Sequence, residues 1–167
     1  ENVSMSEYRV VVVKVVLGFA ASHFISFGVG GCVSLHVLNF RVGVTLTGVL
    51  DRHSLVYDFF ALKRDMEGLL SELDHRLLLP ASNPDLELVE TGSEVEVRHG
   101  DRRYVFPASD VVVLPIPNTT AEKIAEYLGG RLARELRKAG ADTIEQLEVE
   151  VEETPGQSAF WSGPHRA

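Results

Sequence analysis

The sequence has very little cysteine: among its 167 residues, Cys32 is the single one. One thiol cannot form a disulfide within the chain, so we expect a fold that does not depend on oxidation and a reducing, cytoplasmic setting. The sequence also lacks a glycine-rich loop of the kind that binds dinucleotides or phosphates. No internal repeat or low-complexity segment is present.

Clusters of basic residues are also lacking. The chain has 16 lysines and arginines against 24 acidic residues, for a formal net charge of −8. This balance argues against nucleic acid as a partner. The most apolar N-terminal run, residues 10–21, contains Lys14 and is too short to span a bilayer. It also lacks the basic start of a signal peptide, so we expect no membrane partner.

The chain is 45% hydrophobic, enough for the core of one domain over residues 1–167. Valine-rich residues 9–19 predict a first strand, and the alternation in residues 35–50 predicts a second. The second strand places His36 and Leu38 on its apolar face. A buried imidazole needs a polar partner, which a backbone carbonyl could supply without any catalytic role.

Two helices are expected. Asp58 is a good N-cap for a helix over residues 59–73, whose apolar residues repeat at helical spacing. Thr119 and Glu122 form a capping box that opens a second helix, and Gly140 ends it. A pair of glycines, Gly129-Gly130, weakens the helix prediction in its middle.

The remaining segments favour strands. Within residues 81–118 we predict a β-hairpin over residues 86–106 and a further extended run over residues 111–116. Residues 147–153 alternate, so Glu148, Glu150 and Glu152 are expected on a solvated face and Glu153 on the apolar side. Residues 159–161 predict a last short strand, and the residues before Tyr8 a disordered lead-in.

Several short motifs occur together. They are FAASH at residues 19–23, Cys32 with a histidine four residues on, DFFALK at 58–63, LDH at 73–75 and ET at 153–154. In this order they resemble the 6-pyruvoyltetrahydropterin synthase and 6-carboxytetrahydropterin synthase family. The resemblance covers nearly the whole chain except residues 81–118, which we interpret as a subfamily insertion carrying the hairpin.

The resemblance implies an α+β tunnelling fold (T-fold). Its outline is ββααββ, an antiparallel sheet with two helices packed on one face. It also implies a homo-oligomer in which trimers close a β-barrel and two trimers stack as a hexamer, with active sites between subunits. Open sheet edges independently favour such an assembly, because unpaired edges are templates for pairing.

The implied activity is that of a lyase acting on dihydroneopterin triphosphate or a related pterin, in tetrahydrobiopterin or queuosine biosynthesis, with Zn²⁺ as cofactor. His23 and His36 would bind the metal. Cys32, Asp74 and His75 would transfer protons. Glu153 would bind the pterin, and Thr120 would line its pocket.

One departure affects the metal. Where the family has the HGH motif, this chain has His36-Val37-Leu38, so a leucine stands at the third ligand position. Two protein ligands are few for a catalytic zinc. A second hypothesis is therefore a degenerate homologue that binds a pterin or purine without chemistry, and a third is a purely structural hexamer. Cys32 as a small buried side chain and His75 as a helix-end residue are the corresponding structural interpretations.

Overall fold

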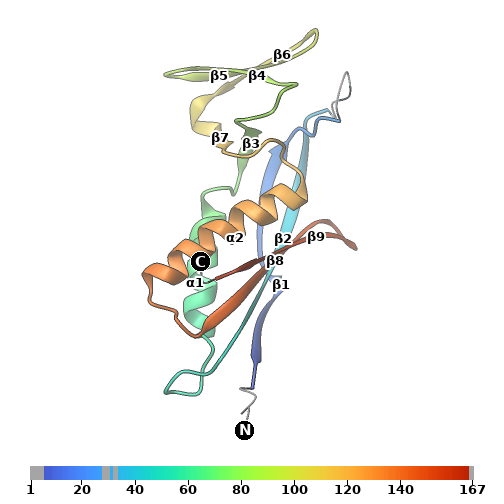
Figure 1. Ribbon diagram of the computed structural model, residues 1–167. Coiled ribbons are helices and arrows are strands. Elements are labelled where there is room, and N and C mark those ends of the chain that lie inside the picture. Colours follow the sequence, from blue (N-terminus) through green and yellow to red (C-terminus); the bar gives the residue numbers. More distant parts are fainter. Residues whose placement is uncertain (1–5, 28–30, 32–33, 166–167) are drawn as a thin grey trace.

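The computed structural model describes residues 6–27, 31 and 34–165 (Figure 1). Its main sheet has six strands in the order β7-β3-β1-β2-β8-β9. The bounds are β1 (Tyr8–His23), β2 (His36–Gly48), β3 (Arg76–Pro80), β7 (Val111–Leu114), β8 (Ile144–Thr154) and β9 (Gln157–Pro164). Both α1 (Phe59–Ser71) and α2 (Ala121–Lys138) lie on the same face of this sheet. This arrangement confirms the α+β class and the two-helix layer. No helix in the described part of the chain is long and apolar enough to cross a membrane.

The predicted ββααββ outline is confirmed for the four antiparallel strands β1, β2, β8 and β9. The sheet is mixed rather than purely antiparallel, because β3 pairs with β1 in parallel and β7 pairs with β3 in parallel. The short apolar runs that form β3 and β7 are buried or half-buried, as expected for parallel strands. Among the described residues, the N-terminal part of β1, from Tyr8 to Gly18, pairs only with β2, so its other edge is open.

Residues 81–118 form more than the hairpin that the sequence predicts. The long alternating stretch is split by a turn at Gly92-Ser93 into β4 (Glu87–Thr91) and β5 (Glu94–His99), which β6 (Arg102–Pro107) follows. The result is a three-stranded antiparallel sheet beyond the end of the main sheet (Figure 1). We call it the outer sheet. The sequence does not reveal the first turn, because residues 86–97 alternate only in part and the alternation resumes after Gly92-Ser93.

The helix N-termini follow the expected capping chemistry with one shift. The Asp58 carboxylate accepts the Ala61 N–H at 2.8 Å, as predicted. The capping box predicted from Thr119 is wrong by one residue: Thr120 is the N-cap of α2 and accepts the Lys123 N–H at 3.4 Å. Gly140 adopts φ +70° just after α2, which confirms its predicted role as the C-terminal glycine.

The prediction of a solvated face for the even-numbered glutamates of β8 is also wrong in part. Glu152 is buried, and its carboxylate lies 2.5 Å from the Lys14 ammonium, which also pairs with Glu150 at 2.8 Å. Lys14 sits where the register of β1 against β2 shifts, between Val12 and Leu17. The hydrogen bond from the Lys14 ammonium holds the pKa of Glu152 below its usual value. The carboxylates of Glu150 and Glu152 are therefore stabilised by pairing with Lys14 of β1 and not only by solvent.

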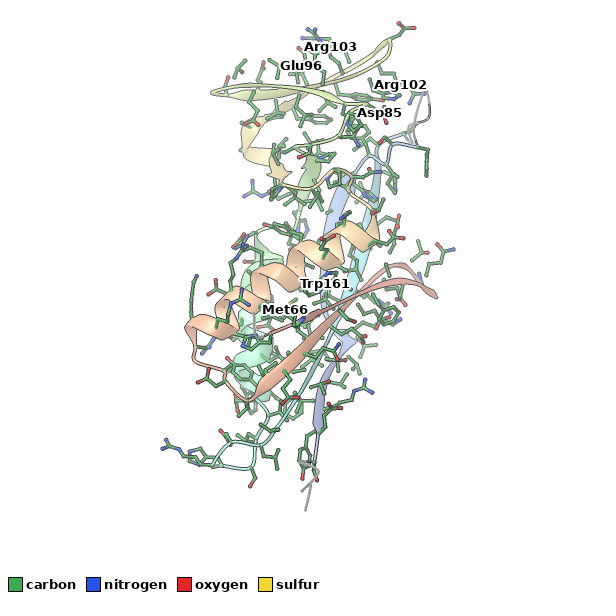
Figure 2. All side chains as sticks on the ribbon, viewed as in Figure 1. Met66, Asp85, Glu96, Arg102, Arg103 and Trp161 are labelled. Carbon is green, nitrogen blue, oxygen red and sulfur yellow. The ribbon has the colours of Figure 1, made fainter. Side chains whose placement is uncertain are left out.

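Trp161 of β9 explains one of the two glycines in the middle of α2 (Figure 2). A Cβ added to Gly129 would lie 2.2 Å from two carbons of the indole ring, whereas one added to Gly130 would meet no atom within 4 Å. Gly129 thus lets the indole lie directly against the helix backbone. Gly130 only lowers the helix propensity.

These two neighbouring positions give a matched test. Gly129→Ala should destabilise the fold by about 1–3 kcal/mol, because the methyl group overlaps the indole. Gly130→Ala should stabilise it by about 1 kcal/mol through helix propensity. Urea unfolding at one protein concentration measures both. Equal effects of the two substitutions would contradict the contact between Trp161 and α2.

Candidate functional site

The site begins with two histidines on adjacent strands. The antiparallel register of β1 and β2 places His23 directly opposite His36. Their Nε2 atoms lie 2.9 Å apart and their ring centroids 4.4 Å apart. His23 lies on the buried face of β1, and His36 lies on the apolar face of β2. The strand alternation therefore brings together two imidazoles from residues that are 13 positions apart in the sequence.

The other ring nitrogen of each histidine faces a backbone carbonyl. His23 Nδ1 lies 2.8 Å from the Thr119 oxygen, and His36 Nδ1 lies 3.1 Å from the Ser34 oxygen. A carbonyl only accepts, so both Nδ1 atoms are the donors and both neutral rings present a lone pair at Nε2. Two lone pairs at this distance favour a cation between them. Hydrogen bonds of this kind are the usual way in which a protein orients metal-binding histidines.

Burial keeps His23 in the neutral form. Its side chain is fully buried, and this lowers its pKa to about 4, although the Thr119 carbonyl partly opposes the shift. At neutral pH the ring is therefore uncharged, which is the form that binds a metal. The alternative predicted for His36, a histidine bonded to a backbone carbonyl, agrees with the contact between its Nδ1 and the Ser34 oxygen but leaves its Nε2 unexplained.

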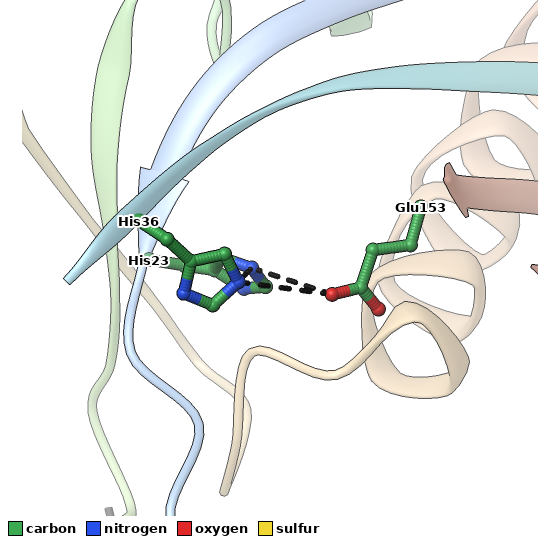
Figure 3. Close-up of side chains that lie close together, drawn as sticks. All are labelled: His23, His36 and Glu153. Atoms are coloured by element: carbon green, nitrogen blue, oxygen red, sulfur yellow. Dashed lines mark hydrogen bonds and ion pairs between the residues drawn. The ribbon is translucent and has the colours of Figure 1, made fainter. Parts of the chain in front are cut away.

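Glu153 completes this cluster (Figure 3). Its Oε1 lies 3.7 Å from Nε2 of His23 and 3.8 Å from Nε2 of His36. The three ligand atoms lie within 4.8 Å of one another. Two ligands about 2.1 Å from a tetrahedral zinc are roughly 3.4 Å apart, so the donor set fits such an ion with small shifts. Two histidines with one glutamate is a donor set used in catalytic zinc sites.

The residue at the family's third ligand position does not take part. Leu38 pairs with Ala21 across the strands, is half-buried, and packs against the main hydrophobic core. It shares the face of His36 but offers no donor atom. Glu153, which the resemblance assigns to the pterin, is the residue that reaches the two imidazoles.

Thr119 and Asn118 are site residues that sequence reasoning missed. Thr119 is fully buried, and its hydroxyl donates to the Phe24 carbonyl at 2.5 Å while its own carbonyl accepts from His23. The Asn118 side-chain amide donates to the Ser26 carbonyl at 2.9 Å. Together they hold the chain that leads into α2 against the end of β1. The sequence signal for this role is the pair Thr119-Thr120. One helix needs only one N-cap side chain, so the other threonine hydroxyl is available for a different hydrogen bond.

The predicted acid–base pair has a separate, well-defined geometry. Asp74 Oδ2 lies 2.8 Å from His75 Nδ1, and Asp74 Oδ1 accepts the Ala20 N–H at 2.8 Å. The Ala20 N–H, followed by His75, holds the pKa of Asp74 below its usual value. His75 adopts φ +58°, a strained conformation for a non-glycine residue, and its N–H donates to the Ala20 carbonyl at 2.6 Å. Ala20 of β1 thus hydrogen-bonds both residues of the pair, Asp74 through its N–H and His75 through its carbonyl.

This pair does not meet the histidine cluster within one chain. His75 is exposed and lines a cavity of about 310 Å³ whose lining includes Ala20, Ser22 and Val37. Ala20 and Ser22 alternate along β1 with the buried Ala21 and His23, so they face away from the core. The predicted site is therefore divided into two parts. Cys32 lies outside the described residues, and Thr120 acts as the cap of α2.

Comparison with known proteins agrees with the fold and the motifs. The family model described as 6-pyruvoyl tetrahydropterin synthase matches residues 12–164. A Methanocaldococcus jannaschii protein, provisionally assigned as a 6-carboxy-5,6,7,8-tetrahydropterin synthase, is 32% identical over 87% of this chain and 89% of its own length. An Aquifex aeolicus 6-carboxy-5,6,7,8-tetrahydropterin synthase is 28% identical over 67% of this chain and 63% of its own.

Comparison with solved structures indicates the same family. A variant of Plasmodium vivax 6-pyruvoyltetrahydropterin synthase, with a catalytic glutamate replaced by alanine, superimposes with a TM-score of 0.89 at 28% identity. The match covers 95% of this chain and 99% of that one, so it includes most of the 81–118 segment. The T-fold that the motifs implied is confirmed. By its sequence and its fold, the chain belongs to the 6-pyruvoyl tetrahydropterin synthase family.

Proposed function

We propose that this protein is a pterin-processing lyase that acts on dihydroneopterin triphosphate or a related pterin, with Zn²⁺ held by His23, His36 and Glu153. One observation carries the proposal: two histidine Nε2 atoms face each other at 2.9 Å, with a carboxylate oxygen within 3.8 Å of both. The related proteins named as tetrahydropterin synthases support the substrate class. The fold alone would not, because one fold serves many functions.

In this proposal, different residues hold the metal and transfer the proton. The Thr119 and Ser34 carbonyls fix the tautomers of the two ligand histidines, and Glu153 adds a negative charge that balances a dication. When bound, the zinc supplies Lewis acidity, which polarises an oxygen of the substrate side chain and makes an adjacent C–H bond easier to deprotonate.

The Asp74–His75 pair moves the proton. Asp74 stays ionised because the Ala20 N–H and His75 both stabilise its charge. Its carboxylate accepts the Nδ1–H of His75, which leaves Nε2 of that ring to take or give a proton. Cys32 stays the proposed thiolate partner in this transfer, as the family resemblance implies.

A second copy of the chain would bring the two separated parts together. His75 points away from the core, whereas His23 is buried on the helix side of the sheet. The open edges of β1 and β9 offer strand pairing to neighbouring copies. We propose a hexamer of two stacked trimers, in which the pair from one copy meets the histidine cluster of another.

A second function is favoured by Leu38. This side chain packs with the core and offers no lone pair, so the metal depends on Glu153. If Glu153 instead binds the pterin, as the resemblance implies, two histidines remain for the metal, and the protein would bind a pterin or purine without turnover. The role of Glu153 therefore decides between the two functions.

Substituting Glu153 tests the ligand set. Glu153→Gln should weaken zinc binding about tenfold or more, because an amide is a poor ligand and the charge that balances the metal is lost. Glu148→Gln is the matched control, since Glu148 lies on the same strand at the opposite parity and meets Ser162. Competition with a chromophoric chelator measures both affinities. Unchanged zinc affinity in Glu153→Gln, together with lost pterin binding, would support the second function.

Restoring the family's third ligand is a further test. Leu38→His should tighten zinc binding about tenfold or more, since one added ligand need supply only ~1.4 kcal/mol. It should also raise the unfolding temperature when zinc is added. Val37→His is the control, because Val37 is the adjacent residue on the opposite face and is 71% exposed. A loss of stability in Leu38→His that zinc does not reverse would show that position 38 does not face the metal.

The shared site can be tested by mixing inactive variants. His23→Ala and His75→Ala should each abolish turnover of dihydroneopterin triphosphate with zinc. Oligomers re-formed from an equal mixture should regain activity, because about a quarter of the sites would combine two intact halves in random assembly. No recovery in mixed oligomers, or a solution mass of one chain, would contradict the shared site. No pterin product from the parent protein would contradict the lyase itself.

A further inference from the structure

Glu153 lies in a bulge at the end of β8. Glu152 pairs with Ser158 of β9. The next pair joins Thr154 to Gln157, so β8 advances two residues where β9 advances one. Glu153 is the extra residue, and a bulge of this kind redirects a side chain. Within the described part of the chain, the Glu153 carboxylate has no hydrogen-bond partner, and only the two imidazoles of the cluster face it. Its position therefore depends on the backbone of the bulge.

The residue before Glu153 is held from the other face of the sheet. Glu152 is only 4% exposed, although strand alternation places its side chain on the face opposite the helices. Its carboxylate lies 2.5 Å from Lys14 Nζ and accepts the Gly156 N–H at 3.3 Å. Gly156 adopts φ +84° in the turn that joins β8 to β9. One buried carboxylate therefore ties this turn to β1.

Lys14 reaches Glu152 from a second bulge, in β1. Between Val12 and Leu17, β1 advances five residues while its partner β2 advances two, and Lys14 lies within this stretch. Because β2 separates β1 from β8 in the sheet, the lysine side chain has to cross β2. Gly43 of β2 has no side chain there, and an added Cβ would lie 3.2 Å from a carboxylate oxygen of Glu150. The bulge and the glycine together make room for the ion pair.

We propose that Lys14 is a positioning residue for the metal cluster. By holding Glu152 on one face of the sheet, it fixes the bulge that directs Glu153 to the two imidazoles on the other face. The contact acts through the backbone, because the two glutamates are joined by one rigid peptide unit. Groups that orient a metal ligand in this way raise its affinity without touching the metal. The proposal rests on the metal-ligand role that is proposed above for Glu153.

The positive charge of Lys14 gives the proposal a distinctive sign. An ammonium group repels a metal dication, so removal of this charge would by itself strengthen zinc binding. Loss of positioning has the opposite effect, because the Glu153 carboxylate would then adopt directions that do not face the imidazoles, and zinc would have to restore the order on binding. The direction of the change in zinc affinity therefore separates positioning from long-range electrostatics.

The experiment compares zinc affinities, by chelator competition, of the parent, Lys14→Met, Glu153→Gln and the variant with both substitutions. Lys14→Met should weaken zinc binding about tenfold, as is usual for groups that orient metal ligands. In the Glu153→Gln background it should have no further effect, because no carboxylate is left to position. Lys14→Arg keeps the charge and should bind zinc like the parent. Glu150→Gln, which removes the other carboxylate partner of Lys14 but lies outside the bulge, should do the same.

Three results would overturn the proposal. If Lys14→Met binds zinc as tightly as the parent or more tightly, while Glu153→Gln binds it weakly, Lys14 has no positioning role and the proposed ligand set stands. If Lys14→Met weakens binding equally in both backgrounds, it acts by a route that does not include Glu153. If Glu153→Gln binds zinc like the parent, the ligand set fails and the positioning role with it. Should metal-free Lys14→Met not melt cooperatively, Glu152→Gln, which keeps the shape of the buried side chain, replaces it in the same comparison of two backgrounds.

Discussion

The pairing of β1 with β2 is the constraint on which the site depends. Its register places His23 opposite His36, and a shift by one residue would turn one imidazole to the other face of the sheet. The stacked rings of Phe19 and Phe40, 4.9 Å apart and also directly opposite each other on the two strands, fix this register by packing. The geometry of the histidine pair is therefore a consequence of core formation, and the polar partners at Thr119 and Ser34 only refine it.

The site shows how a missing ligand changes the role of a neighbouring group. Leu38 adds apolar contact to the core but removes a donor from the face of His36. Glu153 comes from β8, where the register with β9 shifts between Glu152 and Thr154, and its carboxylate reaches both imidazoles. The His23–His36–Glu153 cluster thus offers three donor atoms without a contribution from position 38.

Sequence patterns were sufficient for much of the fold. Period-two alternation and helical spacing identified β1, β2, α1 and α2, and the capping residue Asp58 marked the start of α1 to the residue. The motifs supplied the family and hence the T-fold. The parallel pairing of β3 and β7 could not be predicted, because short buried strands show no alternation that reveals their direction. The split of the outer sheet at Gly92 could not be predicted for a different reason, because alternating residues continue after the turn.

The candidate site was predictable as a set of residues but not as an arrangement. The sequence named His23, His36, Asp74, His75 and Glu153, yet the division of these residues between two faces required the strand parities of β1 and the position of His75 after α1. The proximity of Glu153 to the histidines depends on where β8 ends beside β2, which is a tertiary distance. Thr119 acts through its carbonyl, and no side-chain pattern reports such a role.

The contact between Trp161 and Gly129 has a consequence for assembly. Because the indole lies against α2, the edge strand β9 is anchored to the helix layer instead of being held by β8 alone. An anchored edge has little conformational freedom left to lose when another strand pairs with it. The entropy cost of association is then lower, so a smaller buried area is sufficient for a stable contact at this edge.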